Sequence, residues 1–406
     1  MEKIKDKGQI GEELLSAFFD NNFSKVFSFS KARTKDNAQV ADILIWFNRI
    51  VFLIEIKTRN DELATADISS WFNSRIVKSI DQLTKNANRI KRKERIYLSN
   101  SYYNAELDVE DILLVIGLVI LVYNEEYVAF PSEICPEIYK KEIPIHVFTW
   151  KDLKKMTQEI NTIPDFYHFL RDRYNYVKVY DVATECELNL LAYYKSNDYK
   201  LPESKFNFTE NAIWDNYLIS MKTQIEARQK HNSNSIWIDK LESLFTVQRK
   251  MYQGLPLGLY FSWEIASISR RERAFLGEKF KSMEDQFQKG KASRTFAFKN
   301  LSTGNWLVFF FSKQTIKLAN ISLERNVTLK IIKEIHYNSF DNSVYGFGFE
   351  VSSIFPYALK GLNGSIIIST DAIFGKYSST DIQEAIDVWG DNTTYSQKSI
   401  NEFPEN

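Results

Sequence analysis

The stretch VADILIWFNRIVFLIEIK, residues 40–57, decides the fold of the N-terminal part of this chain. It holds two apolar segments on either side of Asn48 and Arg49, a pattern that predicts two strands joined by a tight hairpin. If the strands pair symmetrically about those two residues, Asp42 lies opposite Glu55. The same pairing follows whether the loop has two residues or four, so the prediction does not depend on the turn type.

Two carboxylates that face each other across an antiparallel pair repel unless a positive charge lies between them. Glu55 and Lys57 share one face of their strand, and the preceding residues are apolar on both faces, as in a buried central strand. Buried carboxylates are retained when they are paired or coordinate a metal, and oxygen ligands suit Mg²⁺ or Mn²⁺. Lys57 would position a water or stabilise a pentavalent phosphate. With Asp42, these residues predict a hydrolytic metal site.

The elements around the hairpin predict a mixed α/β layer architecture in the order α-β-β-β-α-β. The spacing of apolar residues and the turn signals indicate the following elements: a helix over 8–22, a strand over 25–30, a polar loop over 31–39, the hairpin, a helix over about 66–95, one or two buried strands in the apolar run 112–123 as part of a strand pair in 111–130, a strand near Pro144 and a helix over 151–171.

An acid in the first helix, then Asp42, then Glu55-Ile56-Lys57 resembles the PD-(D/E)XK nuclease superfamily, with Ala41 in place of its usual proline. The resemblance implies a restriction-endonuclease-like core in which these acids hold the metal. Residues outside the hairpin extend this resemblance.

The segment GQIGE, residues 8–12, resembles the helix opening of Holliday-junction-resolvase-like, Mrr-like and nuclease-related-domain members. The resemblance implies that Glu12, with Glu13 as the alternative, is an additional and often water-mediated metal contact. It also implies that Gln82 on the next helix completes the site. The resemblance covers residues 8–95.

The helix that carries Gln82 has one basic face and one apolar face. The apolar face, which we expect to pack on the sheet, consists of Phe72, Ile76, Ile80, Leu83, Ala87 and Ile90. The basic stripe, at spacings of three and four residues, consists of Arg75, Lys78, Lys85, Arg89 and Arg92. Beside a metal site, the stripe predicts contact with nucleic acid that weakens as salt rises. The alternative is a solvated helix face.

The composition indicates a globular protein with material for two or three domains. Of the 406 residues 44% are apolar, and the 52 basic and 52 acidic residues cancel, so any surface that binds a polyanion must be local. The two cysteines suit a reducing compartment, the start of the chain lacks the apolar stretch of a signal peptide, and the apolar run 112–123 is too short to span a bilayer. We therefore expect a soluble, cytoplasmic protein.

Four regions follow along the chain. Residues 1–155 form the nuclease-like domain, 156–205 a connector, 206–395 a C-terminal α+β domain and 396–406 a polar tail. In the third region we expect helices over 209–230, 236–253 and 267–289, then short aromatic strands from 293 to about 369. A helix before a hairpin there faintly repeats the N-terminal order, but Phe311 and Lys313 stand where an acid and a lysine would be needed.

These observations predict a Mg²⁺-dependent or Mn²⁺-dependent phosphodiesterase, and by analogy an endodeoxyribonuclease of prokaryotic restriction or anti-phage defence. The C-terminal region would recognise the target, form a homodimer or dock a partner protein of the defence system. DNA is favoured over RNA by the same analogy. Two alternatives stay open: a non-catalytic nucleic-acid-binding or assembly protein that keeps the fold, and a toxin-like RNase.

Overall fold

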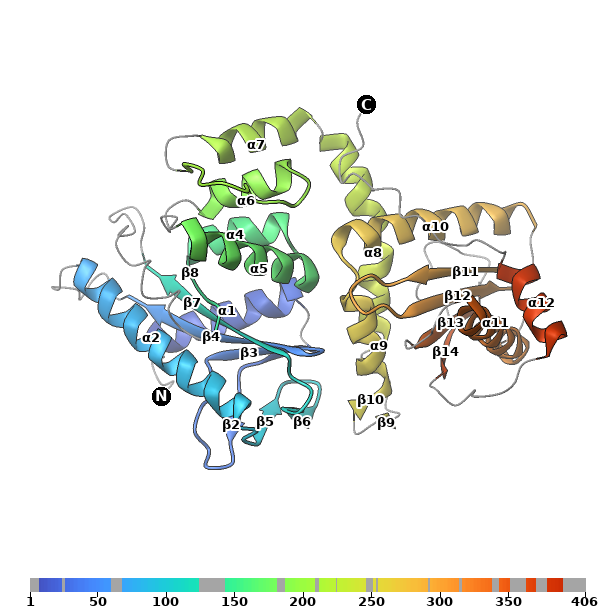
Figure 1. The fold of residues 1–406 in the computed structure, drawn as a ribbon, viewed down its shortest axis with the longest axis horizontal. Coiled ribbons are helices and arrows are strands. Elements are labelled where there is room, and N and C mark those ends of the chain that lie inside the picture. Colours follow the sequence, from blue (N-terminus) through green and yellow to red (C-terminus); the bar gives the residue numbers. More distant parts are fainter. Residues whose placement is uncertain are drawn as a thin grey trace, which may run out of the picture. The chain divides into compact units, whose positions relative to one another are not determined.

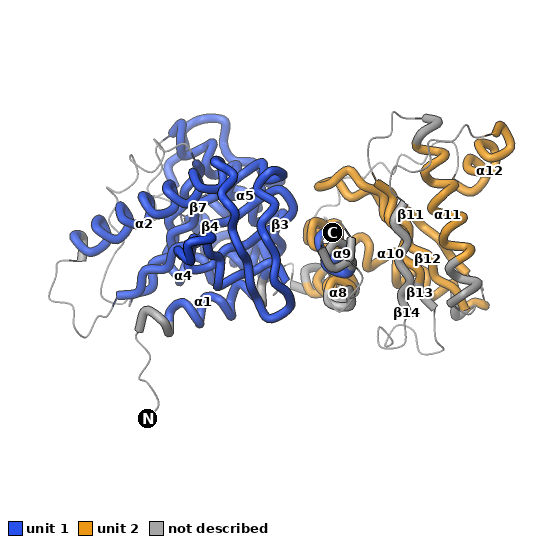
Figure 2. The backbone as a smooth tube through the Cα atoms, turned by 90° about the horizontal axis from the view of Figure 1, so that it is seen from below, with its two compact units in different colours: residues 1–225, 248–263 blue, residues 226–247, 264–406 orange. Residues whose placement is uncertain are grey.

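The computed structural model describes most of the chain as two compact units of mixed α/β structure, with 54% helix and 22% strand. Unit 1 consists of residues 1–225 and 248–263, and unit 2 of residues 226–247 and 264–406 (Figure 2). The described residues are 7–23, 26–59, 68–123, 143–180, 187–208, 212–223, 225–245, 251–252, 255–290, 293–313, 316–337, 343–350, 363–369 and 378–389.

Unit 1 is built on a five-stranded mixed sheet in the order β1-β3-β4-β7-β8 (Figure 1). Its strands are β1 (Ser28–Phe29), β3 (Ile43–Phe47), β4 (Ile50–Thr58), β7 (Leu114–Val122) and β8 (Ile145–Thr149). β1, β3 and β4 pair antiparallel, whereas β7 and β8 run parallel to β4. The apolar run that suggested one or two strands forms the single strand β7, and the rest of the expected strand pair falls largely in residues 124–142, outside the described residues.

The hairpin has the predicted register. Phe47 pairs with Ile50 and the ladder continues to Ile43 with Ile54, so the next residues along it are Asp42 and Glu55. Asn48 has a φ of 53°, in the left-handed region that asparagine tolerates better than most residues and that a tight hairpin turn requires.

Helices cover both faces of this sheet. The apolar face of α2 (Ile68–Lys91) is buried as predicted and packs with Val51 and Leu53 of β4. Successive residues of a strand point to opposite faces, so the even-numbered Thr58 points to the other side. There it meets Gly11 of α1 (Lys7–Phe23), where an added Cβ would lie 2.3 Å from Thr58 Oγ1.

The remaining elements of unit 1 extend this core. They are β2 (Arg33–Thr34), β5 (Ile96–Ser99) and β6 (Asn104–Glu106), which form a second small sheet, the helices α4 (Trp150–Glu159), α5 (Ile163–Tyr180), α6 (Glu187–Ser196) and α7 (Ile213–Thr223), the short pair β9 (Met251–Tyr252) and β10 (Leu255–Pro256), and most of α9 (Leu257–Ala266). The polar loop expected over 31–39 therefore includes a strand, and the helix expected over 151–171 is broken between α4 and α5.

A buried ion pair ties the helical layer to the sheet. Arg173 of α5 donates through Nε to Glu187 Oε2 of α6 at 2.7 Å, and its Nη1 lies 3.0 Å from His146 Nδ1 on β8. Burial and the adjacent guanidinium hold the pKa of His146 well below its ordinary value, so the imidazole is neutral. His146 is thus a packed residue of the layer formed by β8, α5 and α6.

Unit 2 has a four-stranded sheet in the order β11-β12-β13-β14. Its elements are α8 (Ile225–Phe245), which lies in it from residue 226, α10 (Arg270–Gln288), β11 (Ser293–Lys299), β12 (Trp306–Ser312), α11 (Ile316–Tyr337), β13 (Val344–Glu350), β14 (Asn363–Ser369) and α12 (Ser379–Trp389). The aromatic strands are present as expected, and the helix α11, which the aromatic pattern did not indicate, lies between β12 and β13.

Unit 2 repeats part of the order of unit 1. In each unit a hairpin is followed by a helix and then by a strand parallel to the second hairpin strand, namely β3, β4, α2 and β7 or β11, β12, α11 and β13. Each helix passes over a glycine of the parallel strand. An added Cβ would lie 3.1 Å from Leu83 Cδ1 at Gly117 and 2.7 Å from Val327 Cγ2 at Gly346.

The charged pair of unit 1 is not repeated at these positions. Phe311 pairs with Arg294, and its ring lies 5.1 Å from that of Phe280 on α10, so this position is part of an aromatic core. Lys313 is exposed just beyond the end of β12. The two units share an order of elements while only unit 1 has opposed acids in its hairpin. Among the described residues, no helix is long and apolar enough to cross a membrane.

The pKa of Glu264 makes the stability of unit 2 depend on pH. Its buried carboxyl group accepts hydrogen bonds from Asn305 Nδ2 at 2.7 Å and Thr303 Oγ1 at 3.1 Å, and burial raises its pKa from 4.5 to about 7. A raised pKa favours the folded state below the ordinary pKa, and this contribution is lost as the pH rises through about 7.

We predict that the free energy of unfolding of the natural protein, relative to Glu264→Gln, falls by about 3 kcal/mol between about pH 4 and about pH 8. Urea denaturation at a series of pH values measures this difference. Parallel pH curves for the two proteins would contradict the assignment.

Candidate metal centre

Asp42 is held at the entrance to β3 by three hydrogen bonds. Its backbone N–H donates to the carbonyl of Ile54, the residue that pairs with Ile43, at 3.1 Å, so this bond lies one residue out of the β3–β4 register. Its carboxylate accepts from the Ile56 N–H at 2.7 Å through Oδ2 and from Gln39 Nε2 at 3.1 Å through Oδ1. The carboxylate is therefore fixed in direction, close to the carboxyl end of β4.

Glu55 is the opposed acid, and its side chain is almost fully buried, at 3% exposure. Lys57 lies two residues further along the same strand and donates from Nζ to Glu55 Oε2 at 2.8 Å. The structure thus brings together the three residues predicted from the hairpin. The lysine forms an ion pair with Glu55, and its charge also lowers the pKa of Asp42.

Glu12 reaches the same group of charges from α1. Gly11 has no side chain, so the helix can approach β4 at Thr58, and the next residue is Glu12. Burial raises the pKa of Glu12, the negative charge of Asp42 raises it further, and Lys57 opposes both effects. Glu12 is exposed, but it lies close enough to Asp42 and Lys57 to feel their charges.

Burial raises the pKa of both opposed acids. For Asp42 the Ile56 N–H and Lys57 partly offset this effect. For Glu55 the neighbouring Asp42 is the second cause of the increase, and Lys57 offsets part of it. Within the part of the chain that the structure describes, Lys57 is the cation that offsets the raised pKa of all three acids, and an added positive charge would favour their ionised forms further.

The donor set fits a hard divalent cation that keeps several waters. Mg²⁺ is commonly bound through one or two carboxylates, and Asp42 and Glu55 supply two. Among the described residues, no group of three or more His, Cys, Asp or Glu side chains is placed to hold a metal ion. Glu12 is consequently not a ready third ligand in this arrangement, and its predicted role through a bridging water stays a prediction.

The predicted Gln82 has a buried acceptor, Oε1, that receives no hydrogen bond within the part of the chain that the structure describes. Asn86, one turn further along α2, donates from Nδ2 to the Val40 carbonyl at 2.6 Å. Residues four apart share a helix face, so the face that carries Gln82 is turned to the segment that leads into Asp42. A water bound near the acids would supply the donor that Oε1 lacks.

The predicted basic stripe is divided by its contacts. Arg75, Lys78 and Lys85 are exposed on α2. Arg89 Nε lies 3.6 Å from Glu94 Oε2, and Arg92, which follows the end of the helix, donates to Glu94 Oε1 at 3.0 Å. Glu94 thus neutralises part of the stripe at its C-terminal end.

Sequence patterns did not identify the residues that support Asp42. Gln39 lies in a polar loop, where its contact with Asp42 leaves no periodic signal. Asn86 is a polar residue inside the apolar face of α2, between Leu83 and Ala87, and this position could have marked it as a buried hydrogen-bonding group.

Comparisons with known proteins identify no relative: no protein-family model matches the chain, and neither a curated protein nor a solved structure matches it significantly.

Replacing Asp42 by asparagine tests the repulsion directly. We predict that Asp42→Asn stabilises the metal-free protein at about pH 8 by roughly 1 kcal/mol, because one of the mutually repelling charges is removed. We also predict that Mg²⁺ or Mn²⁺ raises the melting temperature of the natural protein and not that of the variant, since only the former binds the ion. Thermal unfolding with and without each metal measures both effects. An equal rise in both proteins would show that the ion binds elsewhere.

Proposed function

We propose that this chain is a metal-dependent nuclease of the PD-(D/E)XK superfamily, with its centre at Asp42, Glu55 and Lys57. The observation that carries the proposal is a pair of neighbouring acids, Asp42 directly before β3 and Glu55 on β4, with Lys57 two residues beyond Glu55. Such an arrangement costs folding free energy in the absence of a cation, and a binding function for a metal accounts for it.

The architecture of unit 1 supports a restriction-endonuclease-like core. Its five-stranded mixed sheet has α1 and α2 on opposite faces, and the acids lie where β4 ends and β3 begins. Fold alone does not define an activity, so the proposal relies on the charged residues rather than on the sheet.

In the proposed reaction, a Mg²⁺ or Mn²⁺ held by Asp42 and Glu55 would supply Lewis-acid chemistry and favour the ionisation of the attacking water. Asp42 and Glu55 hold the ion, and the hydrogen bonds from Ile56 and Gln39 fix the direction of the Asp42 carboxylate. Lys57 exchanges its contact with Glu55 for the attacking water or the phosphate, where negative charge develops. Glu12 and the free acceptor of Gln82 orient waters around the centre.

DNA is the proposed substrate, and prokaryotic restriction or anti-phage defence in the cytoplasm is the proposed role, both by analogy with the superfamily. A homodimer would place two centres on two strands, and unit 2 would serve target recognition, dimerisation or the docking of a partner protein. A non-catalytic nucleic-acid-binding protein and a toxin-like RNase remain the alternatives that the experiment below separates.

We predict that the purified chain cuts linear or supercoiled DNA with Mg²⁺ or Mn²⁺, and that Asp42→Ala and Lys57→Ala each lower the rate by at least about a hundredfold, because each removes a group that stabilises the transition state. Glu12→Gln should lower the rate less, since it acts through water. Gel electrophoresis of the products measures these rates, with chelator as the metal-free control.

Glu13→Gln tests the alternative to Glu12, because both variants change an exposed acid on α1 to its amide, and a larger loss of rate in Glu13→Gln would assign the metal contact to Glu13. Structured RNA in parallel reactions identifies the polymer, and faster cutting of RNA would favour the RNase alternative. If no metal supports cutting and all variants bind nucleic acid equally, the binding-protein alternative replaces the nuclease.

A further inference from the structure

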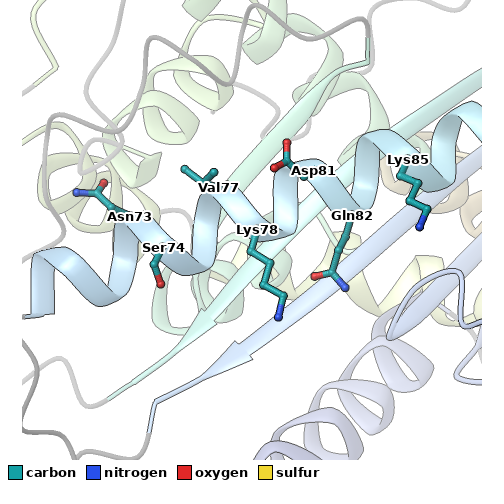
Figure 3. A pocket seen from close by; sticks show the side chains of 7 residues that line it. All are labelled: Asn73, Ser74, Val77, Lys78, Asp81, Gln82 and Lys85. Carbon is teal, nitrogen blue, oxygen red and sulfur yellow. The ribbon is translucent and has the colours of Figure 1, made fainter.

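A hollow of about 610 Å³ lies on the outer face of α2, and the reaction proposed above gives a role only to Gln82 within it (Figure 3). The described residues that line it come from one stretch of this helix, residues 73–85. In Figure 3 the side chains of Lys78, Gln82 and Lys85 extend from the same side of α2, whereas Asp81 points to another side.

Lys78 and Lys85 are the basic residues that line this hollow. Lys78 and Lys85 are exposed, and neither forms an ion pair with an acid in the described part of the chain. This distinguishes them from Arg89 and Arg92, which contact Glu94. A mobile ammonium group is a point charge that can bind a phosphate without a fixed geometry.

The place of the hollow connects it with the metal centre. Gln82 lies between the two lysines along the helix, and one turn further Asn86 binds the Val40 carbonyl, two residues before Asp42. Lys78 and Lys85 are seven residues apart, which is about 10 Å along an α-helix. Three phosphate steps of one DNA strand cover a similar length along the duplex axis, at about 3.4 Å each.

We propose that Lys78 and Lys85, on either side of Gln82 along the helix, bind the sugar–phosphate backbone of a DNA strand that leads to the metal centre. The inference rests on the proposed nuclease function and deepens it by assigning the surface that holds the substrate. The contacts go to phosphates, so they carry affinity and salt dependence and no sequence preference. Arg89 and Arg92 do not belong to this surface.

The test is binding of a fluorescent mixed-sequence DNA duplex to the full chain in chelator, followed by anisotropy over a range of salt concentrations. We expect Lys78→Gln with Lys85→Gln to weaken binding by roughly tenfold for each lysine at about 0.1 M salt and to reduce the slope of log affinity against log salt by about 2. Lys91→Gln is the matched control, since Lys91 is exposed on the same helix and outside the hollow, and should bind as the natural protein does.

Equal affinity and an equal salt slope for the double variant and the natural protein would overturn the inference, and so would failure of the natural protein to bind DNA. Binding that depends on these lysines for RNA and not for DNA would also overturn it. The outcomes separate the two proposals. Normal DNA binding by the double variant, together with loss of cutting in Asp42→Ala, would refute only the proposed DNA-binding surface. Lysine-dependent binding without any cutting would refute only the proposed nuclease activity.

Discussion

The repulsion between two carboxylates fixed opposite each other across a hairpin is the constraint on which the account of this protein depends. The β3–β4 ladder ends at Ile43 and Ile54, so Asp42 and Glu55 follow it directly, and the charge of Asp42 is close enough to raise the pKa of Glu55. A shift of the strand pairing by one residue would turn the side chains of the shifted strand to the other face of the sheet, so the two acids would no longer be neighbours. The site therefore exists only because this register is specified by the apolar pattern and the turn at Asn48.

The helices that bury the sheet also bring further polar groups to the acids. α1 can approach the end of β4 because residue 11 is a glycine, and this approach places Glu12 within electrostatic range of Asp42. α2 covers the other face and carries Gln82, while Asn86 fixes the segment before Asp42. The same packing that stabilises unit 1 thus arranges its charged residues, and the stability of the core and the geometry of the site cannot be varied independently.

Local patterns were sufficient to predict the hairpin, its register and the buried face of α2, because strand alternation and helical spacing are properties of neighbouring residues. They failed where the determining contact is distant in sequence. β2 forms because Arg33 and Thr34 pair with Tyr97 and Ile96. The helix α11 was not predicted, because the aromatic strands on either side of it dominate the pattern of this region. Gln39 was missed for a different reason: its contact with Asp42 spans only three residues, but it lies in an irregular loop that gives no periodic signal.

The central claim is that a divalent cation binds between Asp42 and Glu55. The most direct test is a crystal structure of the full chain grown with Mn²⁺ and measured for the anomalous scattering of manganese. The account predicts an anomalous peak within about 2.0–2.2 Å of oxygen atoms of both carboxylates, with Lys57 displaced from Glu55. A structure in which Lys57 keeps its contact with Glu55 and the manganese lies elsewhere, or is absent, would contradict it.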